Sequence, residues 1–331
     1  MATRIPHLLE SYLALPYEYA QVLLTSVLGA STNWLVLRYL YTYLRKVNAA
    51  GEEGAASASQ SEDVRVVLVS FLRDFAFWKE GAGRLGLDLE GLGRSGKFVF
   101  VDGLSGLFSS PHQAPPPTTP KGRRTIRGAR LADVQRELDG AVADVSAADA
   151  KTVLIVDQPD LLLAASGEDL TGLALRDMLL GVQEKVHASI ITVAADEPLI
   201  AAQTTTLEKE HASLVLGLAH AAETVIGLRL LDTGNASDVS GVLRVTAGGG
   251  GEEDRAAEET ELLYFEGLKL NVTTHRVAVR LFILRRGLEG VARGLESGYD
   301  IPLERKQLSH DEGISNLSRQ STMFFIPEIP H

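Results

Sequence analysis

The sequence predicts an α/β protein with a mostly parallel central sheet, helices on both faces of the sheet and an antiparallel extension at one edge. Short runs in which both faces are apolar alternate with longer amphipathic segments, as parallel strands alternate with the helices that connect them. Beyond residue 225 the strand-like runs follow one another more directly, which predicts the antiparallel edge. The 331 residues, 45% of them apolar, are enough to bury a large core.

Each element can be assigned in order along the chain. Buried strands are expected where an entire short run is apolar, at 22–28, 64–71, 98–101, 153–156 and 189–194. Helices are expected between them, at 33–46, 74–85, 131–145 and 169–186, and over much of 198–220. In the first helix the large apolar side chains recur at helical spacing, at Trp34, Leu37, Tyr41 and Leu44. The antiparallel strands are expected at 225–230, 241–246 and 262–265.

Several segments do not look packed. Residues 48–63 and 247–261 are rich in Gly, Ala, Ser and Glu, and residues 109–130 are first proline-rich and then basic, so all three are predicted to be flexible loops. The predicted domain therefore spans residues 1–266 with these loops. Residues 267–331 form a C-terminal extension with no clear period, and its structure is not predicted.

Composition and charge limit the function classes. The net charge of −11 makes the chain alone a poor candidate for coating nucleic acid, and the lack of cysteine excludes disulfides and thiolate chemistry. The 19 uncharged residues between Glu18 and Arg38 include six polar side chains, which favours a strand, a turn and a helix over a membrane span. Glu10 interrupts the N-terminal apolar stretch too early for a signal peptide. We expect a soluble protein of the cytoplasm, with the nucleus as a second location.

The segment from Gly91 to Lys97 matches the GxxxxGK part of a phosphate-binding P-loop, but the match is misleading. A P-loop leaves a strand and enters a helix, so that backbone N–H groups converge on the phosphates. This segment leaves a predicted helix and enters the strand at 98–101, and Phe98 stands where the Mg²⁺-binding Ser or Thr would follow. We interpret it as a glycine-rich turn.

The position at which a P-loop belongs, directly after the first strand, has a degenerate sequence. Residues 28–34 keep one glycine and contain no lysine. A helix N-terminus still attracts anions weakly, so the candidate residues of a degenerate site are Gly29, Ser31, Thr32 and Asn33. The alternative is a simple strand–helix turn, capped by one of the three polar residues.

The strand at 153–156 leads into Asp157 in the manner of a Walker B strand, whose acid holds Mg²⁺. The alternative is a structural carboxylate at the end of a buried strand. Other patterns are weaker: Glu208 and His211 supply two metal ligands where three or four are needed, and Ser105 does not lie in a GxSxG elbow. We therefore expect no catalytic residue, no metal and no cofactor.

Two distinctive segments are Phe71-Leu-Arg-Asp-Phe75 and Phe100-Val-Asp-Gly-Leu104. Together with residues 153–160 and 188–198 they resemble the family of Elongator complex protein 6, the sixth Elongator subunit, in its fungal form. The resemblance covers residues 5–266. It implies a RecA-like fold with decayed Walker motifs. It also implies a hexameric ring with two copies each of the fourth, fifth and sixth subunits, which joins the catalytic Elongator subunits, binds tRNA and supports modification of the wobble uridine.

The degenerate loop at 29–33 agrees with that family, whereas the tail after residue 265 departs from it. A fold made for ATP that lacks the catalytic lysine favours a non-catalytic structural subunit. Two alternatives remain: an atypical RecA-like ATPase that works through a shared site at a subunit interface, and a relative of the fourth or fifth subunit of the same ring.

The basic segment after the prolines reverses the sign of charge locally. No acidic residue occurs between Asp102 and Asp133, and the interval contains the RNA-binding candidates Lys121, Arg123, Arg124, Arg127 and Arg130. In the context of the resemblance, this segment is predicted to contact tRNA phosphates. The alternatives are a solvated loop and a contact with another subunit.

Overall fold

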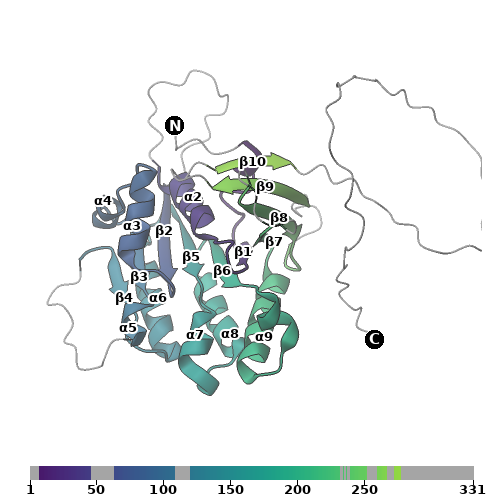
Figure 1. Cartoon of the computed structure of the whole chain (residues 1–331). Helices are drawn as coiled ribbons and strands as arrows, with labels where there is room; N and C mark the ends of the chain where they lie inside the picture. The colour runs from purple at the N-terminus through teal and green to yellow at the C-terminus, as the bar shows by residue number, and fades with distance from the viewer. Residues whose placement is uncertain are drawn as a thin grey trace, which may run out of the picture. The chain divides into compact units, whose positions relative to one another are not determined.

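In the computed structural model, residues 7–45, 63–108, 120–231, 234, 236, 239–251, 259–266 and 272–276 are described. They form one ten-stranded sheet in the order β10-β9-β8-β7-β1-β6-β5-β2-β3-β4, with β10 at one edge and β4 at the other (Figure 1). The strands from β7 to β4 are parallel neighbours, and β8, β9 and β10 continue the sheet in antiparallel fashion. The predicted α/β class and the antiparallel edge are confirmed, except that the first strand of that edge, predicted at 225–230, is β7, which pairs in parallel with β1 and only with β8 in antiparallel fashion.

The strands are β1 (Gln21–Ser26), β2 (Asp63–Ser70), β3 (Phe98–Asp102), β4 (Arg123–Thr125), β5 (Ala150–Asp157), β6 (Ala188–Ala194), β7 (Thr224–Arg229), β8 (Gly241–Ala247), β9 (Thr260–Glu266) and β10 (Val272–Arg276). The α-helices are α1 (His7–Glu10), α2 (Asn33–Leu44), α3 (Phe75–Arg84), α4 (Leu89–Arg94), α5 (Ser105–Phe108), α6 (Leu131–Val145), α7 (Leu161–Ser166), α8 (Gly172–Gln183) and α9 (Thr206–Ala221). A 3₁₀ turn η1 (Gly167–Asp169) and a π-helical turn η2 (Pro198–Ala202) complete the described elements.

The core is divided between the two faces of the sheet, because successive side chains of a strand point to opposite faces. Leu68 of β2 packs in a cluster with residues of α2, α3 and α4, whereas its neighbours Val67 and Val69 pack with residues of α6, α8 and α9. Both clusters are large, and the five strands predicted to be buried, β1, β2, β3, β5 and β6, contribute apolar side chains to both faces. No helix in these residues is long and apolar enough to cross a membrane.

The sheet order makes the fold RecA-like. One strand, β6, separates β1, which leads into the nucleotide position, from β5, which ends in Asp157. Since these strands are parallel, their carboxyl ends meet at one edge: Ser26 is level with Ala194, and Asp157 is level with Thr192 and Ser70. Any site built from the candidate residues 29–33 and Asp157 would have to form there.

The expected loop at 109–130 is not a loop throughout. Residues 123–125 pair with β3 as the short edge strand β4, and the next residue, Ile126, is fully buried. The run was too short and too basic to indicate a strand, and pairing with β3 overrides the weak local preference. Residues 109–119 of the predicted loop lie outside the described residues.

The helix expected over much of 198–220 is divided. Gln203 adopts a left-handed conformation (φ 45°) after η2, and α9 starts afresh behind a capping box. In that box the Thr205 hydroxyl accepts from the Glu208 N–H at 3.2 Å, and the Glu208 carboxylate accepts from the Thr205 N–H at 3.0 Å.

The sheet also continues past residue 266, since β10 pairs with β9. The rest of the predicted C-terminal extension, 267–271 and 277–331, lies outside the described residues, as do 48–62 and 252–258 of the other two predicted loops. The proposed domain limits stay a prediction.

Candidate functional site

The loop between β1 and α2 occupies the position at which a P-loop would bind nucleotide, and its backbone turns tightly. Gly29 adopts φ +92°, a conformation that favours glycine, and a Cβ atom there would lie 3.2 Å from the Leu230 side chain. The preceding residue, Leu28, is 85% exposed. The loop thus turns tightly at its one glycine and presents an apolar side chain where a P-loop presents backbone amides and a lysine.

The backbone amide at the start of this loop is already bonded to a carboxylate. Asp196 lies two residues beyond β6, and its Oδ1 accepts from the backbone N–H of Leu28 at 2.7 Å. The start of α2 is satisfied internally as well, because the N–H of Asn33 donates to Ser31 Oγ at 3.1 Å. Thr32 is buried and its side chain makes no capping hydrogen bond. The geometry is that of a capped turn closed by an acidic side chain, which opposes an incoming phosphate.

Asp157 is fully buried and is held away from this loop. Its Oδ2 accepts from the Ser70 hydroxyl at 2.7 Å and its Oδ1 from the Thr192 hydroxyl at 2.9 Å. Burial raises the pKa of Asp157 above the ordinary aspartate value, although both hydroxyl groups act in the opposite direction. With β6 between them, Asp157 and the β1–α2 loop share no hydrogen bond in the described residues, and the aspartate links β2, β5 and β6.

A buried pair of side chains, Asp160 and His211, lies near Asp157 and was not predicted from the sequence. Asp160 is 5% exposed, its Oδ1 has no hydrogen-bond partner, and its Oδ2 lies 3.9 Å from His211 Nδ1. Burial raises the pKa of Asp160 to about 7. His211 Nε2 lies 2.9 Å from the carbonyl oxygen of Ala194, at the end of β6. The pair therefore connects α9 to the same sheet edge.

No metal centre forms there. Glu208, which shares a helix with His211, caps the start of α9 instead of facing the histidine's partners. Throughout the described ranges, no group of three or more His, Cys, Asp or Glu side chains could hold a metal ion.

The misleading motif at 91–97 is placed as predicted. It begins in α4 and runs into β3, opposite to the order of a P-loop. The Nζ of Lys97 lies 2.7 Å from Asp63 Oδ1, at the start of β2. Lys97 therefore joins the beginnings of two strands, at the end of the sheet opposite to the carboxyl ends of the parallel strands.

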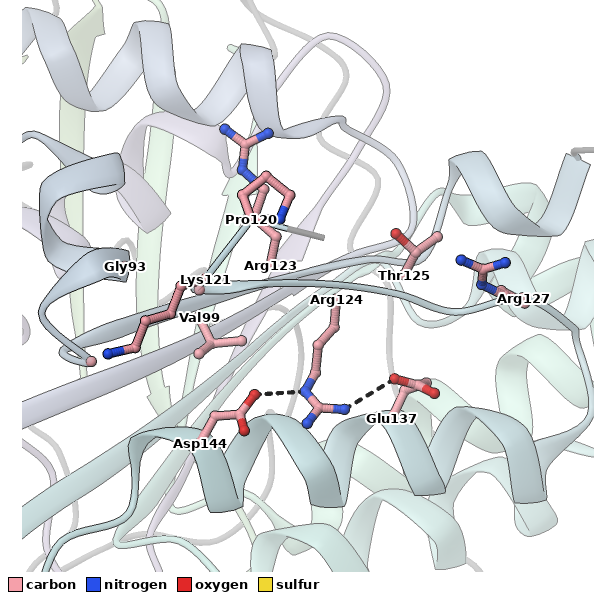
Figure 2. Close-up of a pocket in the computed structure, with 12 residues that line it drawn as sticks. Gly93, Val99, Pro120, Lys121, Arg123, Arg124, Thr125, Arg127, Glu137 and Asp144 are labelled. Carbon is pink, nitrogen blue, oxygen red and sulfur yellow. Dashed lines mark hydrogen bonds and ion pairs between the residues drawn. The ribbon is translucent and has the colours of Figure 1, made fainter. Parts of the chain in front are cut away.

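Two of the five basic candidates are held by acidic side chains of the same chain, and Figure 2 shows the two partners of Arg124. Arg124 lies between Asp144 and Glu137 of α6, with Nε–Oδ2 and Nη1–Oε2 distances of 2.8 and 3.2 Å. The hydrogen bond to Asp144 is the main reason that the pKa of Arg124 is raised.

Arg123 points to the opposite side of the strand (Figure 2). It pairs with Glu90 at 3.0 Å and stacks on the Phe75 ring at 3.7 Å. Both arginines act within the fold.

The other three basic candidates are exposed. Lys121, Arg127 and Arg130 form no ion pair with any described residue. Lys121 and Arg127 line a hollow of about 490 Å³ between β4 and α6, and they extend toward opposite ends of it (Figure 2). These cations, unlike Arg123 and Arg124, are available to an anionic partner.

Comparison with known proteins gives one family and one fold-level likeness. The family model described as Elongation complex protein 6 matches residues 57–269. A solved structure of a KaiC-like protein from the hyperthermophilic archaeon Pyrococcus horikoshii is 16% identical, with a TM-score of 0.49, and the match covers 82% of this chain and 97% of that one. No curated protein matches the chain.

Proposed function

Because this chain belongs to the Elongation complex protein 6 family, we propose that it is a non-catalytic subunit of the Elongator complex. In this proposal it assembles with the fourth and fifth subunits, two copies of each, into a hexameric RecA-like ring. The ring joins the catalytic subunits, binds tRNA and supports modification of the wobble uridine, in the cytoplasm and the nucleus.

One observation carries the non-catalytic part of the proposal: the Asp196 carboxylate accepts from the Leu28 amide at the nucleotide position. A P-loop supplies oriented amides, a lysine and a hydroxyl for Mg²⁺. Here the loop offers no lysine, its Leu28 amide is engaged, and Asp157 is bonded to hydroxyls of other strands. The Asp196 carboxylate thus adds a negative charge beside this loop, and that charge disfavours the binding of a phosphate there.

Three exposed cations support tRNA binding by the ring. Lys121 precedes the edge strand β4, and Arg127 and Arg130 follow it in the connection to α6. Three phosphate contacts give one copy only weak, salt-sensitive binding, but two copies in a closed ring would act together.

Native mass spectrometry of the chain co-expressed with the fourth and fifth subunits tests the proposal. The expected species is a hexamer with two copies of each chain. Binding of a fluorescent ATP analogue to the purified chain, measured in parallel, is expected to be undetectable at micromolar nucleotide. A chain that stayed monomeric beside both partners would contradict the assembly. Tight nucleotide binding that needed residues 29–33 would favour the atypical ATPase instead.

A further inference from the structure

Strand β4 lies at the edge of the sheet opposite to β10, and its outer side carries backbone groups that can pair with another strand. The Gly122 carbonyl oxygen accepts from the N–H of Phe100, in β3, at 2.9 Å. The Ile126 N–H donates to the carbonyl oxygen of Asp102, also in β3, at 2.9 Å. Backbone groups of successive residues alternate between the two sides of a strand. The N–H and C=O of Thr125 therefore face away from β3, on a side where the described residues supply no further strand.

Contacts with helices hold β4 in place on both faces of the sheet. A Cβ atom at Gly122 would lie 2.6 Å from the Cα of Gly93, so β4 begins in close contact with the backbone of α4. Arg123 stacks on the ring of Phe75 in α3, and Arg124 pairs with two acids of α6 on the opposite face. A strand that is already fixed in this way loses little conformational entropy when a second strand pairs with it.

A hollow opens beside β4 on each face of the sheet. The hollow toward α6 has a volume of about 490 Å³ (Figure 2). The hollow toward α3 and α4 has a volume of about 430 Å³, and Phe75 and Leu89 supply apolar parts of its wall. The side chains of a strand added to β4 would alternate between the two faces, and therefore between the two hollows. Backbone pairing combined with pockets for alternate side chains is the arrangement by which extended segments bind to sheet edges.

The charge around this edge favours an acidic segment. Of the described residues that line the two hollows, five are Lys or Arg and three are Asp or Glu. All three acids are paired with arginines of this chain, whereas the exposed Lys121 and Arg127 form no ion pair with any described residue. In a chain with a net charge of −11, this local excess of positive charge is complementary to carboxylates. Nucleic acid would contact the cations alone, because it has no peptide backbone to pair with Thr125.

We propose that β4 is a strand-addition site for an extended acidic segment of a partner protein. The segment pairs with the outer edge of β4, places alternate side chains in the two hollows and directs carboxylates toward Lys121 and Arg127. The proposal goes beyond the proposed function and does not depend on it, because it concerns this chain alone. A segment bound there would compete with tRNA for the same two cations.

The test measures binding of a fluorescent peptide of alternating glutamate and valine to the full chain, by anisotropy at low and high salt. Thr125→Pro removes the outward N–H and keeps the pairing with β3, since proline is tolerated where the N–H faces away from the sheet. It is expected to weaken binding about tenfold and to keep the salt dependence. Thr125→Ala, which keeps the N–H, is the matched control and should bind like the wild type.

The charge contribution is measured with a second pair of variants. Arg127→Gln is expected to weaken binding about threefold at low salt and to flatten the salt dependence. Lys209→Gln removes an exposed cation of α9, far from β4 in the chain, and should leave both unchanged. The same peptide with all its backbone amides N-methylated keeps its charge but cannot pair as a strand, so it should bind the wild type about tenfold more weakly.

Wild-type affinity in a folded Thr125→Pro chain would overturn the proposal. If that variant unfolds, the N-methylated peptide decides, and equal binding of the methylated and unmethylated peptides is then the contrary result. Failure of the wild-type chain to bind the unmethylated peptide would also overturn it. Weaker binding in Arg127→Gln alone would show that the cations attract polyanions, RNA included, without strand addition; this inference would then fail while the proposed function stands.

Discussion

At the scale of single residues, two acidic side chains at one sheet edge have opposite surroundings. Asp196 is partly exposed, and it satisfies a backbone amide. Asp160 is buried, and one of its oxygens has no partner. A hydrogen bond to a charged group contributes about 1.5–3 kcal/mol, whereas an unsatisfied buried charge costs at least as much. Asp196 therefore stabilises the loop as an anion, whereas burial favours the neutral acid form of Asp160.

Asp160 makes stability depend on pH near neutrality. Its pKa is raised to about 7 in the folded state, so the folded chain binds more protons than the unfolded chain between pH 4 and 7, and stability falls as pH rises through that window. Between pH 5 and 8 the expected loss from this group is about 2–3 kcal/mol. The raised pKa of Asp157 acts in the same direction.

The substitution Asp160→Asn should reduce this slope, since the amide does not titrate. Denaturant unfolding followed by fluorescence of the buried Trp34 and Trp78 at several pH values measures it. Asp149→Asn, at an exposed acid, serves as the control and should keep the wild-type slope. An unchanged slope in Asp160→Asn would show that Asp160 is not the titrating group.

Lys97 provides a second prediction at this scale. Lys97→Ala removes the ion pair with Asp63, an exposed contact worth less than about 1 kcal/mol, and touches nothing at the carboxyl edge. We expect any ATPase activity of the assembled ring to be unchanged in a turnover assay. Abolished turnover in a folded Lys97→Ala chain would place the nucleotide site at residues 91–97 after all.

Residue roles were predictable where they depend on local sequence. Asp157 was identified because it ends an apolar run, and Gly29 because it is the one glycine before a helix. The partners of Asp157 and the role of Asp196 could not be predicted, because both depend on which strands are neighbours in the sheet. Ser70 and Thr192 are 87 and 35 residues away from Asp157 in the chain. A clue to Asp196 was available: it follows a buried strand parallel to β1.

At the scale of elements, strong hydrophobic patterns predicted the fold well. Helix α6 has the predicted bounds, 131–145, and the buried strands shift by only a few residues. The elements that were missed have weak or conflicting local signals. Strand β4 has three residues, two of them arginine, and is recognisable only through its partner β3. The break before α9 had a readable signal in the Thr205-x-x-Glu208 capping box.

The basic segment separates into structural and exposed cations because Arg123 and Arg124 lie in β4, where each finds an acidic partner on its own face of the sheet, whereas Lys121, Arg127 and Arg130 lie outside the strand. Reversing the charge of Lys121, Arg127 and Arg130 together to Glu is expected to weaken tRNA binding by the ring. The slope of log affinity against log salt should become shallower by about 2–3 for each copy that contacts RNA. Ring assembly should be unaffected. A filter-binding titration over a salt series measures the slope.

Two controls sharpen this experiment. Lys209→Glu reverses an exposed cation in the first turns of α9 and should leave tRNA affinity nearly unchanged. Arg124→Glu places a third acid beside Asp144 and Glu137, so it should destabilise the fold instead of acting on RNA alone. Unchanged tRNA affinity in an intact ring of the triple variant would show that these three cations do not contact tRNA and that the segment is only a solvated edge of the sheet.

At the scale of the whole molecule, the sheet brings the carboxyl ends of β1, β6, β5 and β2 to one edge. Within the part of the chain that the structure describes, Asp157 is bonded to hydroxyl groups of β2 and β6, and Asp196 to the Leu28 amide. What the fold offers outward instead is exposed leucine, on the β1–α2 loop and on the helices of one face: Leu28, Leu173, Leu180 and Leu216 are each at least half exposed.

Those leucines lead to the last prediction, which concerns stability in the assembly. RecA-like rings close through heterologous contacts, so a subunit leaves apolar surface uncovered when it is alone. Partners that bind only the folded chain stabilise it by about 2.7 kcal/mol at a free concentration one hundred times the dissociation constant, which corresponds to a rise of about 4 °C in Tm for a chain of this size. Thermal unfolding of the chain, alone and with increasing amounts of the fourth and fifth subunits, should show a Tm that climbs with partner concentration. A monodisperse chain whose Tm did not change with either partner would argue against a ring subunit. Covering apolar surface in the assembly must stabilise the folded chain and so raise its Tm.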